Sequence, residues 1–302
     1  MKNHKIIYGA VTASLDVFIS QDIPIKYFSR LIYLYSMSNF QKLGTARLQD
    51  FSTRPFSVAL LYLALLTVSE SVAVMVAPVT GAVMHMAMLF LLLLQAAFTW
   101  FQPIHRFLLA LTLVPLIRII SLSLPLVNFP LIYRLLITSL PLFGAAFVVM
   151  RELNFSWGDV FGFRWRGLPG QLTVGMIGIL LGAIEFTILH PEPLIQSFSW
   201  QSFWLPASIL LISTGFLEEF IFRFLLQRTS IESLGFAVGV AYVGLLFALL
   251  HIGYHSILDF LFVLAAGLFF GLIVFKTRSM IGVAIAHGLT NVSLYLIMPF
   301  IS

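Results

Sequence analysis

Two adjacent glutamates and an arginine stand inside one of the most apolar stretches of the chain. The stretch reads GFLEEFIFRFLLQR over residues 215–228. On a helix, Glu219 and Arg223 are four residues apart and share a face, so they can form an ion pair that stabilises helix packing. Glu218 is rotated from Glu219 by about 100° and therefore faces a different neighbour. A carboxylate without a cation in a low-dielectric site can serve as a general base.

Two later segments supply histidines and an amide at helical spacing. FALLH places Phe247 four residues before His251, and HGLTN places His287 four residues before Asn291. Because residues four apart share a helical face, His287 and Asn291 offer two donors to the oxyanion of a tetrahedral intermediate. Together with Glu218, the set is sufficient for hydrolysis by activated water. The structural alternative is that the histidines are satisfied interior groups and the charges form a packing pair.

The elements that must position these residues are membrane helices. Of the 302 residues, 60% are hydrophobic and only 10% are charged, and the mean hydropathy is +1.02. A soluble domain carries about 25% charged residues. Apolar runs of about 20 residues recur along the chain, and each is long enough to cross a ~30 Å hydrocarbon layer. The composition therefore predicts an all-α, polytopic transmembrane helix bundle.

We expect about nine spans, and the most polar interruption, 151–170, predicts a division into two bundles. The chain then comprises a basic cytoplasmic or interfacial segment at 1–56, about four helices within 57–169, and about five within 170–302. The expected spans lie at roughly 57–77, 81–101, 107–127, 130–150, 170–189, 203–227, 234–252, 257–275 and 280–300.

The distribution of basic residues predicts the orientation of the chain. Of the 17 Lys and Arg residues, only Arg118, Arg134 and Arg223 fall within expected spans, and all the others fall in loops on one side. Because Lys and Arg are retained on the cytoplasmic side, we expect a cytoplasmic N-terminus and an external C-terminus. The net charge of +5 then reflects topology and attraction to membrane lipid rather than nucleic-acid binding. The chain contains no cysteine, which excludes disulfides and thiolate chemistry.

Taken in order, EEFIFR, FALLH and HGLTN resemble the EExxxR, FxxxH and HxxxN motifs of the CAAX prenyl protease and bacteriocin-processing (CPBP, or Abi) family of membrane glutamate proteases. The resemblance covers roughly residues 170–302. It implies a peptidase in which Glu218 and His251 activate water and His287 and Asn291 stabilise the oxyanion. Glu219 and Arg223 would support the site, together with the motif residue Phe247. It implies no cofactor, and its substrate would be a peptide or membrane-anchored protein. We expect the setting to be a bacterial plasma membrane.

Other functions remain open at this point. Glu218, His251 and His287 also match a two-histidine, one-carboxylate zinc set, although the zinc-protease pattern HExxH and the serine pattern GxSxG are absent. A transporter would show inverted repeats or paired broken helices, and none stands out. Glu185 and Arg118 are expected to be buried helix–helix partners. A non-catalytic scaffold or immunity protein would be expected to lose a motif residue.

The depth of His251 in the membrane conflicts with this hypothesis. Counting ~1.5 Å per residue from the cytoplasmic ends, Glu218 lies about ten residues into its span and His251 about seventeen residues into a span that starts at 234. The sequence therefore requires either a re-entrant turn at 229–240 or a steeply tilted span.

Overall fold

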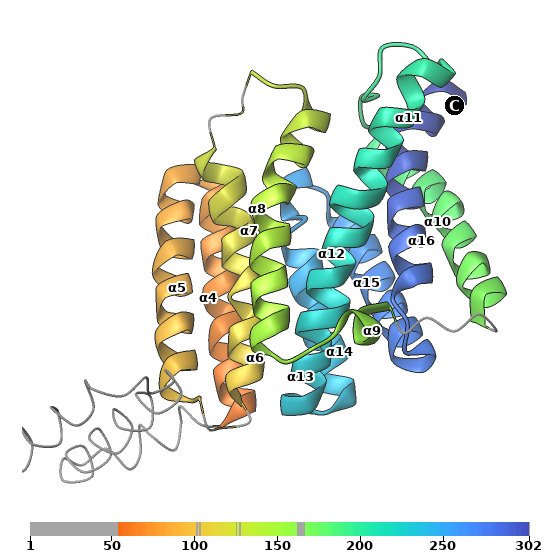
Figure 1. Ribbon diagram of the computed structural model, residues 1–302. Helices are drawn as coiled ribbons and strands as arrows, with labels where there is room; N and C mark the ends of the chain where they lie inside the picture. Colours follow the sequence, from red (N-terminus) through yellow and green to blue (C-terminus); the bar gives the residue numbers. More distant parts are fainter. Residues whose placement is uncertain are drawn as a thin grey trace, which may run out of the picture. The chain divides into compact units, whose positions relative to one another are not determined.

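The computed structural model describes residues 54–301, apart from 101, 103, 125, 127 and 162–166. Nearly all of the predicted N-terminal segment therefore lies outside the described residues. Helices linked by short connections make up the described part, which contains no strand (Figure 1). The all-α fold class is confirmed, while the proposed division into two bundles at 169/170 stays a prediction.

Eight helices of the described part are long and apolar enough to cross a membrane, which confirms a polytopic membrane protein. Three of them are composite: α6 with α7, α14 with the short η4, and α16 with η5 and α17. A short helix, α9 (Trp157–Phe161), lies in the polar interruption. The bounds are α4 (Pro55–Met75), α5 (Pro78–Phe98), α6 (Ile104–Leu111), α7 (Leu113–Ser123), α8 (Leu131–Glu152), α10 (Leu168–Leu189), α14 (Phe236–Leu249), η4 (Ile252–Tyr254), α15 (Ile257–Thr277), α16 (Ile281–Val292), η5 (Ser293–Ile297) and α17 (Met298–Ile301).

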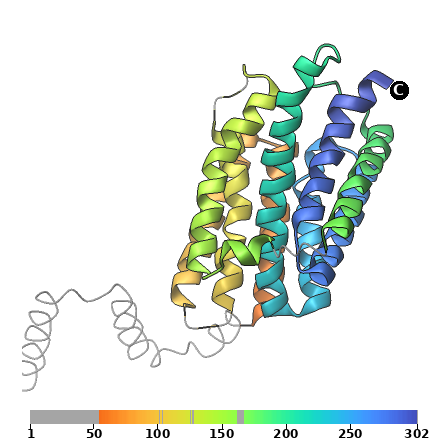
Figure 2. The same cartoon turned by 45° about the vertical axis from the view of Figure 1, so that its right-hand side comes forward.

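The ninth expected span is also helical, but its hydrogen-bonding pattern changes along its length. Its pieces follow one another without a break, and Figures 1 and 2 show them as one rod through the bundle. Two π-helical stretches flank the single turn that holds Glu218 and Glu219, and such π-bulges are frequent at functional sites. The pieces are α11 (Trp200–Ile209), η2 (Leu210–Phe216), α12 (Leu217–Glu219), η3 (Phe220–Leu226) and α13 (Gln227–Leu234).

The extent of α13 removes the conflict over the depth of His251. The sequence ended this span at 227, but the helix continues to Leu234, and α14 begins at Phe236. The turn between them is Gly235, whose φ of 82° suits glycine. Glu218 lies 16 residues before Leu234 (234 − 218), and His251 lies 15 residues after Phe236 (251 − 236). The two residues are therefore equally deep, and neither the re-entrant turn nor the steep tilt is needed.

The polar residues of α13 are typical of a loop, but here they belong to a helix because packing between helices satisfies their hydrogen bonds. The Gln227 side chain donates to the carbonyl of Gly271 at 3.0 Å, and Ser230 donates to the carbonyl of Gly239 at 3.3 Å. Both side chains are buried. A stretch that reads as a polar loop is thus a helix whose polar groups bond to α14 and α15.

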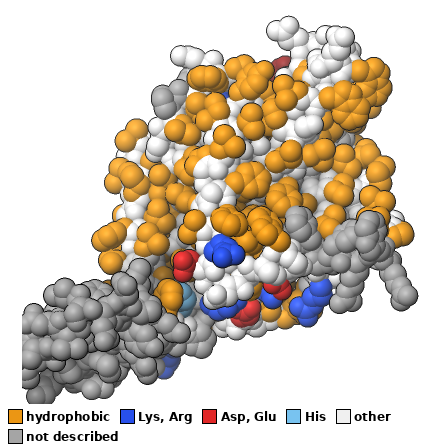
Figure 3. Space-filling view, viewed as in Figure 1, with side chains coloured by type: hydrophobic (Ala, Val, Ile, Leu, Met, Phe, Trp, Pro, Cys, Tyr) orange, Lys and Arg blue, Asp and Glu red, His pale blue; other side chains and the backbone are white. Residues whose placement is uncertain are grey.

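Surface chemistry divides the described part along its height. Figure 3 shows hydrophobic side chains over most of the visible face, whereas charged side chains gather at the lower end. That is the end at which Figure 1 shows α13 and the start of α14. The apolar band is what a lipid-facing surface requires, although which end faces the cytoplasm stays a prediction.

The close approach of α10 to α16 places the last site helix. The two helices lie side by side in Figures 1 and 2. A Cβ atom added to Gly178 in α10 would overlap the backbone carbonyl of Ala286, next to His287. Such small residues let membrane helices approach closely.

We expect Gly178→Ala to destabilise the protein, because its methyl group meets backbone that cannot move aside. Overpacking of this kind costs about 1–3 kcal/mol, and thermal unfolding in detergent would report it as a lowered Tm. Gly144→Ala in α8 is the matched control, since a Cβ there meets nothing within 4 Å. Equal Tm values for the two variants would contradict the tight α10–α16 contact.

Candidate active site

The two adjacent glutamates of α12 have different surroundings. Glu219 is fully buried, and its Oε2 lies 3.2 Å from Nε of Arg223 while its Oε1 accepts a hydrogen bond from Nδ1 of His287 at 2.9 Å. Glu218 keeps 31% of its side chain exposed, and its Oε2 lies 3.8 Å from Nε2 of the same histidine. Glu219 therefore binds the rod to α16, and the accessible carboxylate is that of Glu218.

Charge balance indicates how many protons His287 carries. A carboxylate only accepts hydrogen bonds, so Nδ1 of His287 must hold the hydrogen that it donates to Glu219. Glu218 and Glu219 bring two negative charges, and Arg223 brings one positive charge. A second proton, on Nε2 of His287, would make the charges of this cluster cancel and would place an N–H donor beside Glu218.

Phe247 in α14 packs against the same cluster. The guanidinium carbon of Arg223 lies 4.8 Å from the centroid of its ring, a cation–π arrangement. The ring of His287 meets Phe247 edge-on with centroids 5.6 Å apart. Arg223 is itself buried, and within the described residues none of its three guanidinium nitrogens has a hydrogen-bond partner, although Nε is ion-paired with Glu219. The aromatic face therefore supplies part of the stabilisation of this cation.

His251 lies just past the end of α14. Its Nδ1 lies 2.8 Å from the carbonyl oxygen of Phe247, so Nδ1 carries the hydrogen and Nε2 is the acceptor. His251 and Glu218 line the same cavity of about 430 Å³. The residues that line this cavity also include Ser121, Thr138 and Ser139. Two of the predicted site residues, from separate helices, therefore meet at one space large enough for a peptide segment.

Asn291 lies one helical turn after His287 and is half-buried. Its Nδ2 donates to the hydroxyl oxygen of Thr214 in η2 at 2.8 Å, and an amide nitrogen carries a second hydrogen that this bond does not use. Neither Asn291 nor His287 lines the cavity shared by Glu218 and His251. Asn291 is thus held beside the rod, at the edge of the cluster.

The sequence analysis missed the surroundings of Arg118 in α7. We expected a helix–helix partner, and Arg118 does pair with the buried Glu70 of α4, with Nε 2.8 Å from Oε2. Arg118 also donates to the carbonyl of Leu250 and lines the cavity beside Glu218 and His251. The only signal in the sequence was a charge inside an apolar span. Glu185 in α10 is buried, as expected for a helix–helix contact.

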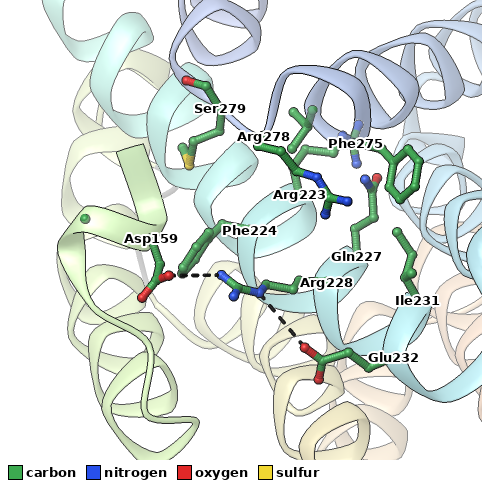
Figure 4. Close-up of a pocket in the computed structure, with 13 residues that line it drawn as sticks. Asp159, Arg223, Phe224, Gln227, Arg228, Ile231, Glu232, Phe275, Arg278 and Ser279 are labelled. Atoms are coloured by element: carbon green, nitrogen blue, oxygen red, sulfur yellow. Dashed lines mark ion pairs between the residues drawn. The ribbon is translucent and has the colours of Figure 1, made fainter. Parts of the chain in front are cut away.

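A second hollow lies at the charged end of the bundle. It measures about 600 Å³ and is lined by residues of α9, η3, α13 and the α15–α16 connection, including three arginines (Figure 4). Arg228 lies 3.8 Å from Asp159 and 4.0 Å from Glu232. The hydroxyl and backbone N–H of Ser156 donate to Asp159 and hold the pKa of its carboxyl below the usual value. Three loops that the charge distribution assigned to one side of the membrane thus meet here.

The arrangement of possible metal ligands bears on the zinc alternative. Among the residues that the structure describes, no three His, Asp or Glu side chains gather closely enough to hold a metal ion. The predicted set of Glu218, His251 and His287 is divided, since only Glu218 and His287 face each other. A zinc mechanism would have to bring His251 to the other two.

Fold and site together define an all-α integral membrane protein with a buried Glu–Arg–His cluster beside a cavity that apolar and charged residues line together. Residues 199–293 match the family profile described as Type II CAAX prenyl endopeptidase Rce1-like. The match spans all three motifs and confirms the resemblance to the CAAX prenyl protease and bacteriocin-processing family. No curated protein and no solved structure matches the chain significantly.

We expect Glu219→Gln to destabilise the protein severely, because it leaves Arg223 buried without a counter-charge. Breaking one partner of a buried pair costs about 3–5 kcal/mol, which thermal unfolding in detergent would detect. Glu232→Gln is the control, since Glu232 pairs with Arg106 at 3.0 Å on the surface, with both side chains more than one-third exposed. A Tm for Glu219→Gln as high as that of the control would contradict the ion pair.

Proposed function

We propose that the chain is an intramembrane endopeptidase that hydrolyses a peptide bond of a membrane-associated protein or peptide with glutamate-activated water. The observation that carries the proposal is the shared cavity of Glu218 and His251, in which Glu218 faces His287 at 3.8 Å. The family description supplies the protease class. The glutamate mechanism is our inference from the contacts.

The first step is the activation of water in this cavity. Glu218 is the accessible carboxylate of the pair, so it accepts a proton from water. His251 has its Nδ1 hydrogen engaged with the carbonyl of Phe247, and its Nε2 can accept the other hydrogen of the same water and orient it. The hydroxide then attacks the carbonyl carbon of the scissile bond, and the carbonyl oxygen takes the negative charge.

The second step is the stabilisation and collapse of the tetrahedral intermediate. We assign the oxyanion to Nε2–H of His287 and the second amide hydrogen of Asn291, and donors of this kind account for much of the rate of acyl transfer. Because neither residue lines the cavity, the oxyanion would lie on the α16 side of Glu218, where His287 faces it. Glu218 passes its proton to the departing amine, and the carbon–nitrogen bond breaks. Glu219 keeps His287 oriented through its 2.9 Å bond to Nδ1.

The cavity also suits the proposed substrate. Apolar side chains such as Leu135, Leu142 and Ile221 form part of its wall. An extended peptide presents apolar side chains and backbone polar groups, and this wall combines apolar residues with serine and threonine residues. From the charge distribution we place the N-terminus in the cytoplasm, and we propose a bacterial plasma membrane as the setting.

The direct test compares the wild type with Glu218→Gln, both purified in detergent with a chelator. Each is incubated with a mixed library of membrane-anchored and prenylated peptides, and mass spectrometry reads the products. We expect wild-type cleavage and a loss of at least about a hundredfold in Glu218→Gln, since the general base is removed. Glu232→Gln, which changes an exposed glutamate at the charged end, should cleave like the wild type.

Other outcomes of this experiment would favour the alternative functions. Wild-type activity that appears only when zinc is added would favour a zinc-dependent hydrolase. No cleavage by any of the proteins would favour a non-catalytic scaffold or immunity protein.

We expect Asn291→Ala to lower kcat by about 10²–10³ with little change in KM, because an oxyanion donor acts mainly in the transition state. Steady-state kinetics on the peptide cleaved best by the wild type would measure both constants. Asn154→Ala, which alters an exposed asparagine after α8, should leave both unchanged. An unaltered kcat in Asn291→Ala would remove Asn291 from the mechanism.

A further inference from the structure

We propose that Arg118 is a positioning residue for His251, supplied by a helix outside the segment that matches the family. The inference rests on the proposed peptidase function, in which Nε2 of His251 orients the attacking water. It assigns to the N-terminal helices a part in building the site, whereas the family match covers only 199–293.

The end of α14 leaves backbone acceptors next to His251. The last carbonyl groups of a helix have no amide partner within the helix, and α14 ends immediately before Leu250 and His251. Arg118 donates to the carbonyl oxygen of Leu250. This bond satisfies an orphan acceptor and places a positive charge at a helix C-terminus, which is the favourable end for a cation.

Arg118 is itself held by Glu70. Nε donates to Oε2 of Glu70 at 2.8 Å, and the terminal nitrogen NH2 contacts Oε1 of the same carboxylate. Glu70 is buried in α4, and Nε2 of His85 in α5 lies 3.4 Å from its Oε2. One edge of the planar guanidinium is therefore paired with the carboxylate of Glu70. NH2 also donates to the carbonyl oxygen of Leu250.

The hydrogen bond from Arg118 to Leu250 bears on the position of the His251 ring. The ring of His251 is tied through Nδ1 to the carbonyl of Phe247, and the backbone directly before it is tied through Leu250 to Arg118. These two anchors set the position of Nε2. A displacement of about 1 Å at a reacting group can cost about a hundredfold in rate.

The location of Arg118 distinguishes it from a remote packing residue. Its side chain is 21% exposed, and it lines the cavity with Glu218 and His251. Arg134 in α8 provides the comparison. It too is an arginine within a span that donates to a backbone carbonyl, that of Phe129 at 2.7 Å, but it does not line this cavity.

The test uses one conservative and one charge-neutral variant of the full-length protein. Arg118→Lys keeps the charge beside Glu70 but loses the planar fork. Glu70→Gln/Arg118→Met removes both charges together, because a buried pair replaced as a whole is tolerated far better than one broken by removal of a single partner. Arg134→Met is the matched control. Thermal unfolding establishes which variants fold, and kinetics use the peptide that the wild type cleaves best.

We expect the double variant to lose about a hundredfold in kcat with KM changed by less than about threefold, since Arg118 positions a group and does not hold the substrate. Arg118→Lys should retain part of the activity, and Arg134→Met all of it. A double variant that folds and keeps the wild-type kcat would overturn the inference. So would a loss confined to KM, which would make Arg118 a substrate-binding residue.

A second readout separates this inference from the proposed function. In protein labelled with ¹⁵N-histidine, the resonances of His251 report its tautomer and its mobility, whether or not a substrate is cleaved. We expect these resonances to shift or broaden in the double variant and to remain unchanged in Arg134→Met. If the wild type cleaves nothing, the proposed function fails, and the ¹⁵N comparison alone decides whether Arg118 positions His251. Unchanged resonances in the double variant would then refute the inference.

Discussion

The rest of the site depends on the two interactions of the buried Glu219 carboxylate. An ionised group with no exposure to water is stable only if it is paired and hydrogen-bonded, and Glu219 has both Arg223 and His287. The ion pair with Arg223 lies within one rod, whereas the hydrogen bond from His287 joins that rod to α16. Because His287 is held by Nδ1, its other nitrogen faces Glu218. One buried charge thus fixes two helices and orients the histidine next to the partly exposed carboxylate of Glu218.

A second set of a glutamate, an arginine and a histidine occurs in the bundle. Glu70 is paired with Arg118 and lies 3.4 Å from His85, so that a glutamate, an arginine and a histidine again share a buried site. Arg118, which belongs to this second set, lines the cavity, and so does Glu218, which faces His287 of the first set. Ionisable groups within a membrane are costly, and here pairing holds Arg118 and faces Glu218 with a histidine at a cavity whose other walls are largely apolar. One residue paired with or facing each cluster, Arg118 and Glu218, lines the same cavity.

The rod that carries Glu218 and Glu219 is irregular where an ordinary span would be uniform. Two π-helical stretches enclose α12, and each alters the rotation of the side chains that follow relative to a regular helix. Close contact on the far side keeps the partner helix in place, since Gly178 leaves no room for a side chain between α10 and the backbone of α16. Local irregularity and tight packing together decide which side chains of the motifs meet.

The sequence by itself determined the class of the protein and the contacts within single helices. Composition established an all-α membrane bundle, and four-residue spacing correctly predicted the Glu219–Arg223 pair and the proximity of Phe247 to His251. Only the tertiary structure decided three hydrogen bonds between helices. They run from His287 to Glu219, from Asn291 to Thr214 and from Arg118 to the carbonyl of Leu250. It also showed that the polar residues of α13 are helical. The reason is physical: periodicity describes one helix at a time, whereas these contacts depend on the depth, rotation and spacing of helices relative to one another.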